Sequence, residues 1–337
     1  MLLTQFYRFA DKDSARLPEI KGFLLSFTNP PADENHGHYF EGPVSLTFAG
    51  LIAVRMKNIL IPTDFSKNAR NAISYAMEFF KEQRCTFYFL HTYTPAFYRM
   101  DYILGGPGFS AIPDKGLDIS QAGLEQTVAD VKAQYGNPNH TFEMVSAFNI
   151  LSDEINELTK RKDISLVVMG TQGATGAKEI FLGSNAVYVI RKSRIPVLVV
   201  PEGFAYRPAG RILFPTDYLS RYRDKDLQIL IAFAKMQQAT VTVLHVQEEN
   251  PLSVLQQENR TMLDRSLQQL SHRMEELKGA YMPDAVIDFA DRMEADMVVM
   301  MHRRHSFLQR LLLQQNIDQI GFHTKVPLLV IRDTSEI

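Results

Sequence analysis

Short apolar runs rich in β-branched residues alternate along the chain with segments whose apolar residues fall three or four positions apart. The runs are typical of strands buried on both faces, and the spaced segments are typical of helices with one buried face. Ala69, Ile73, Ala76 and Phe80, for example, predict a helix that begins after Ser66, a residue type suited to an N-cap. Strands that alternate with helices predict βαβ units and a parallel sheet.

The alternating pattern occurs twice. Four apolar segments of the first half recur in the same order in the second half, which predicts two copies of one domain. The matched segments are 57–64 and 211–217, 86–91 and 240–245, 165–169 and 296–300, and 195–200 and 326–331. A chain of 337 residues has room for two domains of roughly 150 residues each.

The repeat also predicts the domain limits. We expect a first domain at 56–201, a linker rich in Gly and Pro at 202–210, and a second domain at 211–337. Residues 1–55 match neither copy. Because the repeat begins directly after Met56, we hypothesise that Met56 is the natural start, and that the preceding extension is disordered or not natively translated.

The second copy is shorter than the first. The separation between His91 and Pro196 exceeds that between the matching His245 and Pro327 by 23 residues. The loss therefore falls between the second strand and the last strand of the second copy.

We expect two segments to account for this loss. The first is the Gly/Pro-rich loop at 93–115, where the second copy has only 247–252. The second is a candidate third strand at 141–148, because Lys278 of the second copy leads almost directly to a helix near Pro283. A strand at a sheet edge is the easiest to lose, since fewer ladder hydrogen bonds depend on it.

Composition and charge narrow the function classes. The formal net charge of −2 gives no electrostatic case for nucleic acid or an anionic membrane as a partner. No stretch approaches ~20 apolar residues, so no membrane span is expected, and the polar N-terminus does not resemble a signal peptide. Cys85, the one cysteine, opens an apolar run and is expected to be a buried structural thiol. We expect a cytoplasmic protein.

One glycine motif predicts chemistry. Gly170 and Gly173 follow the fourth strand of the first copy, and Gly183 comes nine residues after Gly173, followed by Ser184. A phosphate can approach backbone N–H groups closely where no Cβ intervenes. The residues after Ser184 have helical spacing, so Gly183 and Ser184 are expected at a helix N-terminus, which favours anions. Alternatively, the glycines serve loop turns and helix packing.

This spacing, G-x2-G-x9-G-[ST] after a Val-Val-Met strand, resembles the ATP-binding signature of the universal stress protein family. The segments at 59–66 and 195–200 also resemble that family, and the resemblance covers residues 56 to about 333. It implies two tandem α/β domains of the Rossmann-like, adenine-nucleotide α-hydrolase type, each a doubly wound parallel sheet of strand order 3-2-1-4-5. Asp64 and Gly170 would then meet in the crevice beyond the first and fourth strands, where ligands bind.

The resemblance assigns nucleotide contacts residue by residue. The adenine and ribose would be flanked by Pro62, Thr63 and Asp64, and the adenine would also meet the backbone of Thr92, just after the second strand. The ribose and phosphates would be lined by Met169, Gly170, Gln172 and Gly173. The phosphates would be held by Gly183, Ser184 and Asn185. The resemblance implies ATP with Mg²⁺ or Mn²⁺, and no metal-ligating residue of the protein is singled out. Alternatively, Asp64 caps the following helix or stabilises a turn.

The second copy departs from the motif. Counted from the shared proline, the motif residues Gly170, Gly173, Gly183 and Ser184 become Met301, Arg304, Gln314 and Gln315, whereas Asn185 and Asp64 are kept as Asn316 and Asp217. Larger side chains there would occupy the space that phosphates need, so we expect no ATP site in this copy. Arg303, Arg304 and His305 predict a solvated basic loop rather than an anion site.

We therefore expect a stress-response protein that binds ATP in its first domain and acts as a nucleotide-dependent regulatory or interaction protein. No catalytic residue is predicted, and at most slow ATP hydrolysis is expected. One alternative is an enzyme of the adenine-nucleotide α-hydrolase class, although its S-G-G-x-D-S and His-x-Gly-His motifs are absent. Another is an interaction module with a vestigial site. The resemblance also implies that the last strands, 195–200 and 326–331, pair within one chain, and a homodimer stays open.

Overall fold

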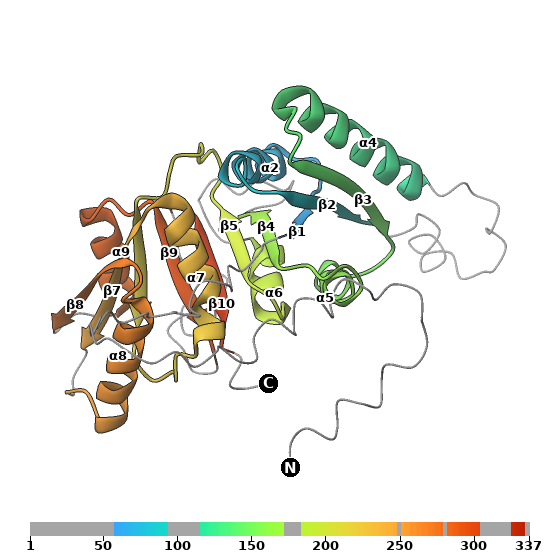
Figure 1. Ribbon diagram of the computed structural model, residues 1–337. Coiled ribbons are helices and arrows are strands. Elements are labelled where there is room, and N and C mark those ends of the chain that lie inside the picture. The colour runs from blue at the N-terminus through green and yellow to red at the C-terminus, as the bar shows by residue number, and fades with distance from the viewer. Residues whose placement is uncertain are drawn as a thin grey trace, which may run out of the picture. The chain divides into compact units, whose positions relative to one another are not determined.

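A computed structural model describes residues 57–93, 115–171, 183–247, 251–278, 282–303 and 325–333. The extension at 1–55, and with it the hypothesis about Met56, lies outside these residues. The described strands form one sheet in the order β3-β2-β1-β4-β5-β10-β9-β6-β7-β8 (Figure 1).

The first half of this sheet is a five-stranded parallel unit of order 3-2-1-4-5, as predicted. Its helix α2 begins directly after Ser66, whose hydroxyl oxygen accepts a hydrogen bond from the Ala69 N–H at 3.1 Å. The predicted N-cap is therefore confirmed. The elements are β1 (Asn58–Pro62), α2 (Lys67–Phe79), β2 (Cys85–Thr92), α4 (Lys115–Tyr135), β3 (His140–Ala147), α5 (Leu151–Lys162), β4 (Leu166–Gly170), α6 (Ser184–Lys192) and β5 (Val197–Val200).

The second half of the sheet repeats this topology. Its strand order, β8-β7-β6-β9-β10, is again 3-2-1-4-5 when the strands are counted from β6. The elements are β6 (Arg211–Thr216), α7 (Asp224–Gln237), β7 (Thr240–Gln247), α8 (Val254–Leu267), β8 (Ser271–Lys278), α9 (Met282–Arg292), β9 (Met297–His302) and β10 (Leu328–Arg332). The predicted tandem of two doubly wound domains is confirmed.

The predicted loss of the third strand from the second copy is wrong. That strand is present as β8, which pairs with β7 over eight residues at the edge of the sheet. It escaped detection because one face of an edge strand meets solvent, and its sequence, SHRMEELK, lacks the apolar run of a buried strand. The shortening lies instead in the connection before α8 and in α8 itself, which has 14 residues where α4 has 21.

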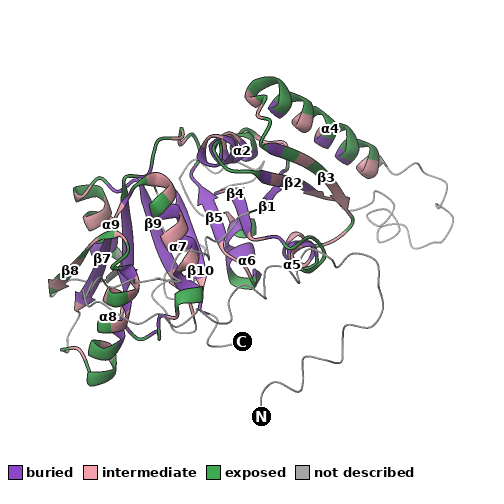
Figure 2. Ribbon diagram, viewed as in Figure 1, coloured by how far each residue is buried: buried purple, intermediate pink, exposed green. Residues whose placement is uncertain are grey.

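Two apolar clusters cover the two faces of the sheet. Helices α2, α4, α7 and α8 pack on one face, and α5, α6 and α9 pack on the other. Successive strand residues alternate between the clusters, as Ile59 and Leu60 do in β1, and Figure 2 shows the central strands as buried. Cys85 is buried, and burial raises the pKa of its thiol to about 12, so it is a structural thiol as expected.

The two domains join through their last strands. β5 and β10 pair antiparallel, with Leu198 opposite Leu329, which confirms the predicted pairing within one chain. Arg332 at the end of β10 donates a hydrogen bond of 2.6 Å from Nε to the carbonyl oxygen of Ser193, the C-cap of α6, where a cation is favoured by the helix dipole. None of the described helices is long and apolar enough to cross a membrane.

Because β5 and β10 pair antiparallel, β10 and β9 begin at the same end of the sheet at which β4 and β5 finish. The carboxyl ends of the first domain's strands and the amino ends of the second domain's strands therefore lie at the same end of the sheet.

Candidate nucleotide-binding site

A tight turn follows β1 and begins the candidate site. Thr63 is buried, and its hydroxyl oxygen accepts a hydrogen bond of 3.1 Å from the N–H of Phe65. Asp64 is exposed, and its Oδ1 accepts a hydrogen bond of 3.1 Å from the N–H of Ser66. Phe65 has a φ of 63°, a left-handed conformation rare for an aromatic residue. One oxygen of Asp64 thus stabilises the turn, which is the alternative role that the sequence left open.

The end of β2 lies beside this turn. Thr92 is the last residue of β2, not the residue after it as predicted. The neighbouring His91 has its ring 4.6 Å from the Phe65 ring, and its Nδ1 lies 2.9 Å from the hydroxyl of Ser120 on α4. Burial lowers the pKa of His91, although nearby Asp64 opposes the shift, so the imidazole is neutral at pH 7. These contacts give His91 a structural role beside the turn.

The third strand end belongs to β4, on the other side of β1. Met169 is buried, and Gly170 ends the strand. A Cβ added to Gly170 would lie 2.8 Å from Cγ and Oδ1 of Asn68, at the beginning of α2. A side chain at 170 would have to displace the Asn68 side chain, so this glycine also serves the packing of α2 against the sheet, the alternative that the sequence left open. Asn68 itself has no signal in the sequence that marks it as part of this crevice.

Helix α6 supplies the phosphate part of the motif. Gly183 is its N-cap, as predicted, and the Gly183 N–H donates to the carbonyl oxygen of Thr171, directly after Gly170. This hydrogen bond places the N-terminus of α6 next to the end of β4. Ser184 and Asn185 in its first turn are exposed. Gln172 and Gly173 lie outside the described residues.

The N-terminus of α6 differs from that of every other described helix. Its N-cap residue, Gly183, supplies no side-chain cap, and its first turn contains no acidic residue. Side chains cap α2 and α8, through Ser66 and Ser253, and the first turns of α4, α5, α7 and α9 contain acidic residues. The first-turn N–H groups of α6 and the positive end of its dipole therefore suit an anion from outside the protein.

The turn after β6 in the second domain repeats the first. Tyr218 is left-handed with a φ of 53°, its N–H donates to Thr216 Oγ1 at 3.0 Å, and Asp217 Oδ1 accepts a hydrogen bond of 3.0 Å from the N–H of Leu219. The imidazole of His245 lies 4.9 Å from the Tyr218 ring, as His91 lies near Phe65. The local backbone and its aromatic packing are thus kept in both copies.

The crevice beyond this second turn contains an ion pair. Arg303 Nη2 lies 2.5 Å from Asp217 Oδ2, and the two side chains are only 12% and 19% exposed. By register with the neighbouring strand, Met301 stands where the first domain has Gly170, and counting along the sequence matches Arg303 to Gln172. The prediction of a solvated Arg303 is therefore wrong, because the kept aspartate binds it. Arg304, His305, Gln314, Gln315 and Asn316 lie outside the described residues.

Within the described ranges, no group of three or more His, Cys, Asp or Glu side chains is placed to hold a metal ion.

The sheet topology and the repeated turns at the strand ends define a tandem α/β protein of the doubly wound type. The model of the universal stress protein family matches residues 56–201 and 208–332, and the chain belongs to this family.

Individual relatives agree with this assignment. The chain is 32% identical over 154 residues to universal stress protein MJ0531 of Methanocaldococcus jannaschii, which covers 43% of this chain and 82% of that protein. It is 26% identical over 157 residues to universal stress protein MJ0577 of the same organism, covering 44% of this chain and 97% of that protein. The crystal structure of a universal stress protein from Archaeoglobus fulgidus aligns with a TM-score of 0.61 and 19% identity, over 84% of this chain and 98% of that one, which supports the fold.

Proposed function

We propose that the first domain binds ATP, and that the chain acts in the stress response as a nucleotide-dependent regulatory or interaction protein. The observation that supports this most is the N-terminus of α6, where the N-cap residue is a glycine without a capping side chain and the first turn contains no acidic residue. It lies next to the carboxyl end of β4, in the crevice where doubly wound folds bind ligands. Membership of the universal stress protein family supports the same proposal.

Each part of the nucleotide has a proposed contact. The phosphates would approach α6 at Gly183, where no Cβ intervenes, and would accept hydrogen bonds from the N–H groups of Ser184 and Asn185 in its first turn. The cation, Mg²⁺ or Mn²⁺, would be held by the phosphates. The ribose and adenine would lie over the carboxyl ends of β1, β2 and β4. The residues at these ends are Pro62, Thr63, Asp64, Thr92, Met169 and Gly170, and Gln172 and Gly173 come after β4 in the sequence.

We propose no catalytic residue. His91, the imidazole near the crevice, has its Nδ1 engaged by Ser120, which in turn lies 2.7 Å from the hydroxyl of Ser146. Ser120 is fully buried, so this contact holds one ring nitrogen of His91 against the protein interior. We therefore expect binding with at most slow hydrolysis.

The Gly183→Val variant tests the phosphate contacts by isothermal titration with ATP and Mg²⁺. Gly183 has a φ of −59°, so its backbone conformation accommodates valine, and the new side chain would stand in front of the first-turn N–H groups. We expect wild-type protein to bind ATP and the variant to lose at least about 100-fold in affinity, roughly 2.7 kcal/mol.

Tyr188→Ala is the matched control, because Tyr188 lies on the same helix and is 58% exposed. Its affinity for ATP should equal that of the wild type. Retained affinity in Gly183→Val would refute the phosphate assignment. Failure of the wild type to bind ATP would leave the interaction module, and rapid turnover would favour the enzyme.

A further inference from the structure

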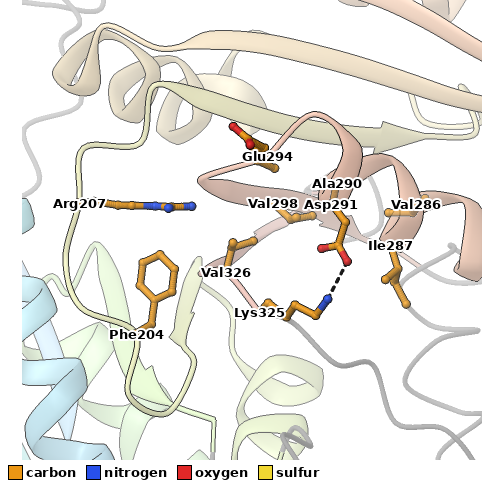
Figure 3. A pocket seen from close by; sticks show the side chains of 11 residues that line it. Phe204, Arg207, Val286, Ile287, Ala290, Asp291, Glu294, Val298, Lys325 and Val326 are labelled. Carbon is orange, nitrogen blue, oxygen red and sulfur yellow. Dashed lines mark hydrogen bonds and ion pairs between the residues drawn. The ribbon is translucent and has the colours of Figure 1, made fainter.

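A cavity lies between the interdomain linker and helix α9, and none of the proposed nucleotide contacts lines it. It has a volume of about 360 Å³ and is bordered by the linker residues Phe204 and Arg207, by α9, and by the residues at the beginning of β9 and before β10 (Figure 3). This volume lies within the range of sites for small organic ligands. The cavity lies at the end of the sheet where the strands of the second domain begin. The second copy of the nucleotide crevice lies at the opposite, carboxyl ends of those strands, so the cavity is a different place.

The floor of this linker cavity is apolar. Val286, Ala295 and Val298 are almost completely buried beneath it, and Ile287, Ala290 and Val326 form its sides. Phe204 adds an aromatic wall from the linker, and Figure 3 shows its ring facing the cavity below Arg207. Such a surface binds hydrocarbon or aromatic groups through the hydrophobic effect.

The cationic group of the cavity is Arg207, which reaches in from the linker. Its guanidinium carbon lies 5.6 Å from the centre of the Phe204 ring, and its Nη2 lies 3.2 Å from Asp296 Oδ1. Among the described residues, Asp296 is its only ion-pair partner, and the Arg207 side chain remains 52% exposed. The planar guanidinium therefore keeps N–H donors for a second acceptor, and its fork matches a carboxylate.

Asp296 does not depend on Arg207 alone. It is 7% exposed, and its Oδ2 accepts a hydrogen bond of 2.9 Å from the backbone N–H of Arg211 and also lies 3.5 Å from Arg211 Nε. A ligand that shares the Arg207 guanidinium would thus leave this buried carboxylate with partners.

The other charges at the opening limit the charge of the ligand. Lys325 Nζ lies 2.7 Å from Asp291 Oδ2, and Glu294 Oε2 lies 2.7 Å from Arg211 Nη1. With these pairs formed, the two carboxylates cancel the charges of Lys325 and Arg211, so the opening has no excess positive charge that would favour a doubly charged phosphate over a single carboxylate.

We propose that the linker cavity is a second ligand site, which binds a small monocarboxylate with an apolar or aromatic body. The body occupies the apolar floor beside Phe204, and the carboxylate accepts paired hydrogen bonds from Arg207. The site is built from the linker and the second domain, so it gives the domain without the glycine motif a ligand of its own.

The test is a ligand-observed NMR titration of the full chain with naphthalene-2-carboxylate. Naphthalene-2-methanol is the neutral probe of the same shape, and 2-naphthyl phosphate is the doubly charged probe. We expect the carboxylate to bind at least about tenfold more tightly than either. Absence of saturable binding of the carboxylate up to millimolar concentration, or equal affinity of the alcohol, would overturn the proposal.

Two variants locate the site. Arg207→Met should remove the preference for the carboxylate over the alcohol, and Ala290→Phe should fill the cavity and abolish the binding of both probes without touching a charge. Arg221→Met, at an exposed arginine outside the cavity, should change nothing. Unchanged binding in Ala290→Phe would overturn the proposal even if Arg207→Met failed to fold. Gly183→Val should bind the carboxylate as the wild type does, which separates this site from the proposed nucleotide site.

Discussion

The two domains share a turn but differ in what their aspartates bind. Asp64 and Asp217 each follow the first strand of a domain, and each accepts a hydrogen bond from the backbone N–H two residues later. Asp64 is exposed in its crevice, whereas Asp217 is mostly buried against Arg303. The fold thus needs the aspartate for its turn in both copies, so its presence alone does not indicate a nucleotide site.

The difference lies in the residues that follow the fourth strand. In the second domain, Met301 stands where the first domain has Gly170, and Arg303 matches Gln172 in the sequence. The Arg303 guanidinium binds Asp217, and its positive charge is thereby used within the protein and not for a ligand. Beside Asp217, the second domain thus has an internal ion pair at the position where the first domain has the exposed Asp64 beside its proposed ligand. The comparison predicts that the second crevice contributes to stability and the first to binding.

Breaking the Arg303–Asp217 pair should have the largest effect on stability. Asp217→Asn removes the charge and leaves Arg303 mostly buried without its counter-ion, so we expect a loss of about 2–3 kcal/mol in the free energy of unfolding. Asp64→Asn, the equivalent change at an exposed side chain, should cost less than about 0.5 kcal/mol. Urea denaturation of both variants checks this, and equal losses would contradict the assigned difference between the crevices.

Adding a side chain at Gly170 should have the next largest effect. In Gly170→Ala the new Cβ meets the Asn68 side chain at 2.8 Å, and such overpacking costs about 1–3 kcal/mol. The double variant with Asn68→Ala should recover part of this loss, because it removes the atoms in contact. Thermal unfolding of the two single variants and the double variant measures the coupling. If the loss of stability in the double variant equalled the sum of the losses in the two single variants, Asn68 would not be the reason for glycine at this position.

Acidification should have the smallest effect, and it should fall on the first domain. Burial lowers the pKa of His91 and of His140 below the usual value of 6.5, so the unfolded chain takes up protons that the folded domain does not. Stability is therefore unaffected above that value and falls as the pH decreases below it. Urea midpoints at pH 7.5 and 5.5 should differ less in His91→Gln than in the wild type. A steeper dependence in the variant would contradict the direction of the pKa shift.

Much of the fold could be predicted from the sequence, because buried parallel strands are continuous apolar runs and because the domain occurs twice. The N-cap at Ser66 and the beginning of α6 at Gly183 follow from local residue preferences and were found. The edge strand β8 was missed because its exposed face is polar, so its pattern is not that of a buried strand. The apolar pattern of a strand is clear where both of its faces are covered, and it is weak in an edge strand such as β8.

The missed parts of the candidate sites depend on contacts between distant segments. Asn68 and Gly170 touch only because α2 packs over β4, and Arg303 meets Asp217 across 86 positions of the chain. The linker cavity likewise brings Arg207 to residues of α9 and to Val326. No spacing rule within a single segment predicts such contacts, because they arise from the packing of helices and linker against the sheet.

The central claim is that only the first domain binds ATP, and a crystal structure of the chain with ATP and Mg²⁺ tests it most directly. The account predicts one nucleotide per chain, with its phosphates at the first-turn N–H groups of α6 and with the Arg303–Asp217 ion pair intact. Nucleotide bound beside Asp217, or phosphates placed away from Gly183, would contradict it.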